Sequence, residues 1–289
     1  MNAIPGVPVP HGAFATRRVS RYRPKFGPVA NDADPASRPA HRAGRAAPRF
    51  LPVGDTGISV EFGTEIDPAL NDAVTSLDHA IAGAELLGVV ETVPSFRSLL
   101  VIFEPALVDR ASLLAELRVL AGRATRGKHL PGRRWTLPVV YAPPFGEDLA
   151  EVASLLGMAE RQVIAAHTEA EFRVYMLGFQ PGLPNLGGLP PALHVSRRTT
   201  PRAPVPGGSV MIGGVQGAIM PLSTPSGFYL LGRTPVRLFD RRRPEPALLR
   251  AGDAVRFREV CADEYDALRE MVAAGNIDAG AALEIADAA

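Results

Sequence analysis

Apolar and polar positions follow regular periods from residue 50 onwards, and the first of them predict a small α/β unit. A turn at 51–57 leads into a strand at 58–62. A helix begins at Asp67-Pro68, since proline suits a first helical turn, and its apolar face recurs every three or four residues at Leu70, Val74, Leu77 and Ile81.

The pattern of apolar residues predicts further strands and a second helix up to about residue 140. Strands are predicted at 89–96 and 98–104 and a second amphipathic helix at 108–120, which gives the order β-α-β-β-α. A strand at 135–141 either closes a ferredoxin-like split βαβ sheet or begins the next unit. A domain boundary is expected near residues 130–140, in a basic, glycine-containing stretch.

In the second half of the chain, helices are predicted at 148–156 and 160–166, and the helical periodicity mostly stops after them. Short apolar runs then alternate with glycine and proline, which is typical of a β-barrel or sandwich. These runs lie at 172–179, 209–214, 217–222, 227–232, 235–240 and 254–260. A last helix is expected from Asp263 to about Ala274, and the small residues after it should fray.

Residues 1–48 are rich in proline and arginine, and their only acidic residues are Asp32 and Asp34. Their apolar residues follow no period, so we expect disorder, because too little surface can be buried to offset chain entropy. The arginines are compatible with a targeting or anion-binding arm, although an unstructured extension is commoner. The predicted organisation is a basic Pro-rich extension, a small α/β domain, a β-barrel domain and a tail, at 1–48, 49–132, 133–275 and 276–289.

The charge balance excludes several classes of protein. There are 31 Lys and Arg residues against 30 Asp and Glu, a net charge of +1, so the chain as a whole carries no footprint for nucleic acid or an anionic membrane. No apolar run approaches the roughly 18 residues of a membrane span, and no secretory signal is recognisable. The single cysteine, Cys261, excludes an internal disulfide framework. We therefore expect a cytoplasmic protein.

The familiar catalytic motifs are absent from the sequence. No histidine stands at metal-ligand spacing from another and there is no Cys-x-x-Cys, so no metal site is expected. There is no phosphate-binding P-loop, no dinucleotide-binding glycine pattern and no nucleophile elbow at Ser209. A self-contained ATPase, dehydrogenase or serine hydrolase is therefore disfavoured.

Three stretches taken in order carry a more specific signal. They read HTEAEFRVYMLGFQPGLPNLGGLP at 167–190, RRTTPRAPVPGGSVMIGG at 197–214 and PLSTPSGFYLLGRTPVRLFD at 221–240. The succession GF-x-PG-x-P, PR-x-x-VP-x-GSV and GRTP resembles the family of the 5-oxoprolinase B subunit, which is also called allophanate hydrolase subunit 1. The resemblance extends over roughly residues 51–260.

This resemblance implies an α+β chain in which a small ferredoxin-like domain precedes a cyclophilin-like β-barrel domain. It implies a subunit that is inactive alone and belongs to a heteromeric enzyme, which opens 5-oxo-L-proline to L-glutamate and hydrolyses ATP. The implied partners are a larger homologous barrel subunit, of the type of allophanate hydrolase subunit 2 or the 5-oxoprolinase C subunit, and a lactam-utilisation-type subunit. ATP is used by the complex, and no cofactor is assigned to this chain.

The same family leaves other functions open. One is a regulatory binding protein that inhibits a histidine kinase. Another is a carboxyltransferase component of the urea carboxylase type, which acts with biotin. A peptidyl-prolyl isomerase rests on fold analogy alone.

The stretch at 200–214 suggests a site, because its prolines stiffen an extended loop and its glycines allow a ligand close to the backbone. Arg202 could clamp a carboxylate, with Arg233 as the second choice, and His167 could transfer a proton, so these three are the predicted catalytic residues. The predicted substrate-binding residues are Phe179, Pro181, Gly182, Pro206, Gly207, Ser209, Gln216, Ser226, Gly227 and Thr234.

Each of these assignments has a structural alternative that the sequence leaves open. Arg202 could pair with an acidic neighbour while the glycines serve turns. His167 could cap the preceding helix, and Arg233 could tie two strands together.

Three positions depart from the family's usual pattern. Asn185 and Met220 stand where the family usually has tyrosine, and Phe228 stands where it has tryptophan. Aromatic rings with a polar group often orient a small ligand, so these changes bear on which substrate is bound.

Overall fold

The computed structural model describes residues 47–124, 132–141 and 143–274. Nearly all of the predicted extension, the basic stretch before residue 132 and the predicted tail lie outside the described residues. The disorder expected there and the domain boundary at 132/133 therefore stay predictions.

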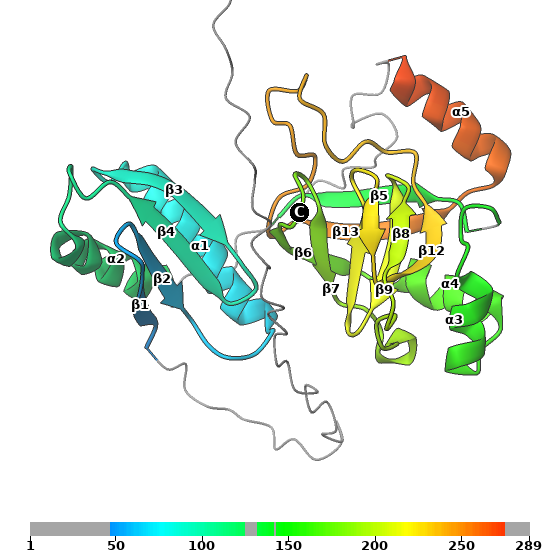
Figure 1. Ribbon diagram of the computed structural model, residues 1–289, viewed down its shortest axis with the longest axis horizontal. Coiled ribbons are helices and arrows are strands. Elements are labelled where there is room, and N and C mark those ends of the chain that lie inside the picture. Colours follow the sequence, from blue (N-terminus) through cyan, green and yellow to red (C-terminus); the bar gives the residue numbers. More distant parts are fainter. Residues whose placement is uncertain (1–46, 125–131, 142, 275–289) are drawn as a thin grey trace, which may run out of the picture. The chain divides into compact units, whose positions relative to one another are not determined.

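The first half of the chain forms a four-stranded antiparallel sheet in the order β1-β2-β4-β3, drawn in blue to cyan in Figure 1. Two helices pack with it. The elements are β1 (Arg49–Val53), β2 (Gly57–Glu61), α1 (Pro68–Ala84), β3 (Val89–Pro94), β4 (Ser98–Phe103) and α2 (Arg110–Ala124).

Helix α1 starts and packs as its sequence predicts. The Asp67 side chain accepts hydrogen bonds from the backbone N–H groups of Ala69 and Leu70, at 2.8 and 3.1 Å, and so caps the helix at its first turn. The apolar stripe buries Val74, Leu77 and Ile81 in one cluster with the inward side chains of β2 and β4.

The turn predicted from residue 51 was wrong for residues 51–53, which belong to strand β1. Residues 49–53 pair with β2 from Arg49 opposite Glu61 to Val53 opposite Gly57. Their partly exposed side chains show no clean alternation, because β1 is an edge strand. Because β1 takes the edge place beside β2, the strand expected at 135–141 is not needed there and begins the next unit.

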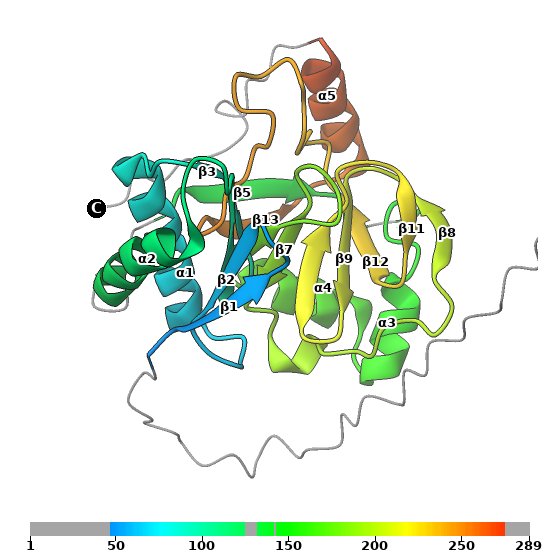
Figure 2. The ribbon, with the colours of Figure 1, turned by 60° about the vertical axis from the view of Figure 1, so that its left-hand side comes forward.

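The second half forms a strongly curved seven-stranded sheet in the order β12-β9-β10-β7-β6-β13-β5, seen from two sides in Figures 1 and 2. A two-stranded sheet of β8 and β11 accompanies it. The strands are β5 (Arg134–Val139), β6 (Phe172–Leu177), β7 (Pro184–Gly187), β8 (Arg202–Val205), β9 (Ser209–Gly213), β10 (Gln216–Ile219), β11 (Thr224–Ser226), β12 (Tyr229–Arg233) and β13 (Ala254–Glu259).

The two edges of this sheet meet at one bridge. The backbones of Val140 and Arg233 exchange hydrogen bonds of 3.0 and 2.9 Å, which connect the ends of β5 and β12. Gly232 makes the approach possible, since a Cβ there would lie 2.6 Å from the carbonyl oxygen of Val140. The predicted barrel is thus confirmed as a nearly closed one.

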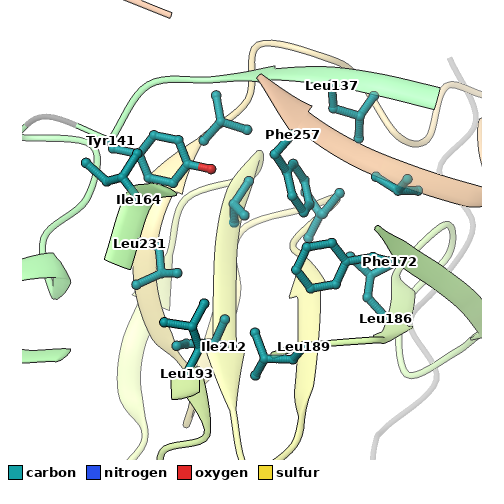
Figure 3. Packing of buried hydrophobic residues seen from close by; sticks show 14 of the residues in the cluster. Leu137, Tyr141, Ile164, Phe172, Leu186, Leu189, Leu193, Ile212, Leu231 and Phe257 are labelled. Carbon is teal, nitrogen blue, oxygen red and sulfur yellow. The ribbon is translucent and has the colours of Figure 1, made fainter. Parts of the chain in front are cut away.

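Three helices belong to this half: α3 (Leu149–Leu156), α4 (Glu160–Glu169) and α5 (Ala262–Ala273), with a 3₁₀ turn at Pro191–Leu193. Helix α3 contacts β12, and α4 contacts β13. The interior is aromatic and aliphatic, and Figure 3 shows Phe172 beside Phe257 with the Tyr141 hydroxyl pointing into the cluster. None of the described helices is long and apolar enough to cross a membrane.

Most of the predicted strands of this half are confirmed within a few residues, but four points are corrected. Residues 235–240 form no strand, and Phe239 makes only a single bridge with Ala247. The strands β7, β8 and β11 were not predicted; each contains proline, which weakens a strand signal.

Candidate functional site

A pocket of about 460 Å³ opens on the outer face of the barrel wall, and we call it the wall pocket. Its floor follows from the alternation of strands β9 and β10. Val210, Ile212 and Ile219 belong to the barrel interior, whereas Met211 and Ala218 face the other way. The lining residues are Phe179, Leu183, Asn185, Arg197, Arg198, Pro201, Met211, Ala218, Met220, Pro225, Ser226, Gly227 and Phe228.

The floor of the wall pocket is apolar. Leu183, Met211, Ala218 and Met220 form one buried cluster, against which Phe228 packs. Polar groups stand among these side chains, including the Asn185 amide and the guanidinium groups of the arginines. An apolar cleft of this size with a few polar groups is the usual form of a small-molecule site.

Phe179 lies at the pocket. The residue is 83% exposed, and its backbone has a φ of 72°. A left-handed conformation is costly for a bulky residue, of order 1–3 kcal/mol, and such strain is found preferentially at functional sites. The turn is fixed from both sides, because Gly178 N–H donates to Leu183 O and Leu183 N–H donates to Gln180 O, both at 3.1 Å.

Arg202 is held by acidic groups. It donates to Glu147 at 2.7 Å and to Asp148, whose side chain is nearly fully buried. Asp148 also accepts the Leu230 N–H at 2.9 Å and lies 3.4 Å from Arg198. Arg202 is therefore paired with acidic neighbours, which is the structural alternative given for it above.

Arg198 shares in the same ion-pair network. It donates to Glu151 at 2.8 Å and lies over the ring of Tyr229, 5.0 Å from its centroid. The hydrogen bond with Glu151 is the main cause of its raised pKa. The network thus ties the start of α3 to the segment that carries the pocket's arginines.

Arg197 has a different environment. Its guanidinium lies 4.7 Å from the centroid of the Phe228 ring and donates to the neutral Gln216 side chain at 3.2 Å. It forms no ion pair with any carboxylate of the described residues. Gln216, a predicted binding residue, does not line the wall pocket but is hydrogen-bonded to Arg197, which does.

Of the other predicted binding residues, Ser226 and Gly227 line the wall pocket together with Phe179. The Ser226 hydroxyl accepts the Phe228 N–H at 3.2 Å, and the Gly227 carbonyl accepts the Arg198 N–H at 2.9 Å. Pro181 and Gly182 belong to the same turn as Phe179 but do not line the pocket.

Gly207 and Thr234 lie elsewhere, in a second pocket of about 260 Å³ beside α5. Arg233 is close to it, because its guanidinium lies 5.5 Å from the Phe145 ring centroid and the Phe145 ring packs against Tyr265 with 4.7 Å between centroids. Burial is the main cause that raises the pKa of Tyr265, which lines this pocket.

Ser209 and His167 are buried and line neither pocket. The Ser209 hydroxyl donates to the carbonyl of Pro206 at 2.8 Å. The His167 ring lies in the barrel core, 2.8 Å from the Tyr141 hydroxyl and stacked on Phe257. Burial lowers the pKa of His167 to about 3 and raises that of Tyr141, so the imidazole is neutral.

Sequence reasoning missed several lining residues, above all Arg197 and Arg198. Their signal was the arginine pair that opens the stretch RRTTPRAP. The three departures from the family pattern, Asn185, Met220 and Phe228, all line this one pocket. Within the described residues, no group of three or more His, Cys, Asp or Glu side chains is arranged to hold a metal ion.

Comparison with known proteins agrees with the resemblance seen in the sequence. The model of the family "Carboxyltransferase domain, subdomain C and D" matches residues 48–249. A Bacillus subtilis protein named as the B subunit of 5-oxoprolinase is 35% identical over 228 residues, which cover 75% of this chain and 95% of that protein.

Two solved structures extend the comparison. The crystal structure of TTHA0988 is 37% identical with a TM-score of 0.65, over 71% of this chain and 40% of that longer chain. The urea carboxylase of Kluyveromyces lactis is 22% identical with a TM-score of 0.64, over 78% of this chain and 23% of its own. At that identity, the second likeness shows the fold alone.

Proposed function

Because the chain belongs to the family "Carboxyltransferase domain, subdomain C and D", we propose that it is the B subunit of a 5-oxoprolinase. This enzyme complex opens the cyclic amide 5-oxo-L-proline to L-glutamate. The observation that carries the proposal is the match over 95% of the 5-oxoprolinase B subunit from B. subtilis. The wall pocket, with its apolar floor and polar groups, supports it as a place for a small ring.

The proposal includes ATP hydrolysis by the complex and inactivity of this chain alone. The sequence supports a division of labour, since it contains no P-loop and no dinucleotide-binding motif. The proposed partners are the larger homologous barrel subunit and the lactam-utilisation-type subunit. This chain would bind and orient the ring while ATP is bound by another subunit.

A carboxyltransferase reaction of the urea carboxylase type is not carried forward, because the likeness to that protein is one of fold. Kinase inhibition is not carried forward either, since no described feature favours a kinase as the partner.

The test is 5-oxoproline-dependent ATP hydrolysis by the co-purified subunits, with and without this chain. We expect glutamate and ADP to form only when all subunits are present. A matched control omits 5-oxoproline, which measures ATP hydrolysis that is not coupled to ring opening. Equal glutamate formation without this chain, or none with the assembled complex, would refute the proposal.

A further inference from the structure

Arg197 and Arg198, which line the wall pocket, and the neighbouring Arg202 differ in how their charge is balanced. Arg198 is paired with Glu151 and Asp148, and Arg202 with Glu147 and Asp148. Arg197 has no carboxylate partner among the described residues, and its hydrogen-bond partner Gln216 is neutral. A ligand carboxylate arriving at the pocket would therefore meet one uncompensated cation.

The position of Arg197 suits anion binding. The Phe228 ring holds one face of its guanidinium, and Gln216 accepts from one terminal nitrogen, which leaves other N–H donors for a ligand. Arginine binds carboxylates with paired, charge-assisted hydrogen bonds. Phe228 belongs to the apolar lining, so the bound carboxylate would lie beside the apolar floor.

Asn185 is the only amide side chain among the residues that line this pocket. The side-chain amide has no hydrogen-bond partner among the described residues. A primary amide offers both a donor and an acceptor, the complement of the N–H and C=O of a cyclic amide.

We propose that the wall pocket binds a five-membered cyclic amide carboxylate, with Arg197 at the carboxylate and Asn185 at the ring amide. The ring methylenes would contact Met211 and Met220. This inference rests on the proposed function, because Arg197 and Asn185 are assigned here as the groups that bind the substrate of that complex. It replaces Arg202 by Arg197 as the carboxylate-recognising residue.

Three probes separate the two contacts by ligand-observed NMR titration of the full chain. 5-Oxoproline carries both groups, cyclopentanecarboxylate only the carboxylate, and 2-pyrrolidinone only the ring amide. Arg197→Gln should weaken the binding of the two carboxylate probes roughly tenfold or more and leave the binding of 2-pyrrolidinone unchanged. Asn185→Leu should weaken the binding of 5-oxoproline and 2-pyrrolidinone roughly fivefold and leave the binding of cyclopentanecarboxylate unchanged.

Arg256→Gln is the matched control, because Arg256 is an exposed arginine on β13 that pairs with Glu171 and does not line the wall pocket. It should affect none of the three probes. Equal thermal midpoints of all variants establish that the pocket is intact. Unchanged carboxylate binding by Arg197→Gln, or loss of all probes in both pocket variants, would overturn the inference.

If the chain alone binds no probe, the same variants are measured in the assembled complex. There Arg197→Gln should raise the KM for 5-oxoproline with kcat nearly unchanged, and an unchanged KM would refute the assignment. If the complex has no 5-oxoproline-dependent activity, the proposed function fails, while probe binding still decides the present inference. Absence of probe binding to both chain and complex would refute this inference as well.

Discussion

The imidazole of His167 is neutral throughout the physiological pH range because its ring lies in the barrel core. The residue is 1% exposed, its Nδ1 atom lies 2.8 Å from the Tyr141 hydroxyl, and its ring stacks on Phe257 with 4.6 Å between centroids. Such surroundings suit a packing role and offer no path to a ligand in either pocket. Proton transfer by His167 stays a prediction. A measurement of the pKa of its imidazole would test it.

The low pKa of His167 makes stability depend on pH in a definite direction. Between its ordinary pKa of 6.5 and the folded value of about 3, the unfolded chain binds a proton that the folded chain does not. The free energy of unfolding should therefore be highest above pH 6.5 and fall by up to about 1.4 kcal/mol per pH unit below it.

Urea unfolding at pH 7 and pH 5 would measure this change. His167→Phe, which keeps an aromatic ring beside Phe257, should lose this part of the pH dependence. His194→Gln, at an exposed histidine, should retain it. An imidazole of His167 that titrates near pH 6.5 by NMR would contradict the prediction and bring proton transfer back into consideration.

At the scale of elements, Asp148 links three segments distant in sequence. It precedes α3, accepts the Leu230 N–H of β12 and contacts Arg198 and Arg202 on the segment that borders the wall pocket. A buried carboxylate with these partners holds Arg198, which lines the pocket, and Arg202 in place. Removing its charge leaves two arginines without their shared partner.

Asp148→Asn should lower the free energy of unfolding by about 3 kcal/mol, because it breaks a buried ion pair. Glu151→Gln is the matched control, since Glu151 also contacts Arg198 but its side chain is 48% exposed. Its cost should stay below about 1 kcal/mol. Guanidinium denaturation of both variants measures the difference, and equal costs would show that Asp148 is no anchor.

The helices and most long strands could be predicted because their signals are local. Asp67 caps α1 and its apolar stripe repeats with the helical period, so the start and inner face of α1 were both readable. Strand β8, in contrast, exists because Val205 pairs with Thr224 in β11, and no local pattern reports that partner. Its proline hides the strand further.

The candidate site was predictable only in part for the same reason. Phe179, Ser226 and Gly227, which were predicted to bind substrate, line the wall pocket. Which arginine remains unpaired could not be read, because the partners of Arg202 lie more than fifty positions earlier, at Glu147 and Asp148. The burial of Ser209 likewise depends on a partner distant in sequence, because Ser209 pairs with Arg233 in β12.

At the scale of the whole barrel, closure depends on one close contact. The bridge between Val140 and Arg233 is the described link between β5 and β12, and Gly232 allows the backbones to meet there. A side chain at residue 232 would collide with the backbone of Val140 and with Val139. The first obstacle is backbone and the second is a methyl group of Val139, which is fully buried, so the seam itself would have to open.

Gly232→Ala should therefore destabilise the barrel by about 2 kcal/mol or more. Gly83→Ala offers the matched control, because Gly83 is helical and a Cβ there meets nothing within 4 Å. That variant should be neutral or up to about 1 kcal/mol more stable. Thermal unfolding by calorimetry compares them, and a Gly232→Ala protein as stable as the unsubstituted chain would contradict the tight seam.

The pairing of β5 with β13 also has a consequence for synthesis. Strand β5 leaves the ribosome first among the barrel strands, yet its neighbour in the sheet, β13, begins only at Ala254. The four strands of the small sheet are complete by Phe103, so that unit can fold while translation continues. The nascent barrel keeps an unpaired edge at β5 until β13 has been made, and this is the stage at which chaperones should bind this chain.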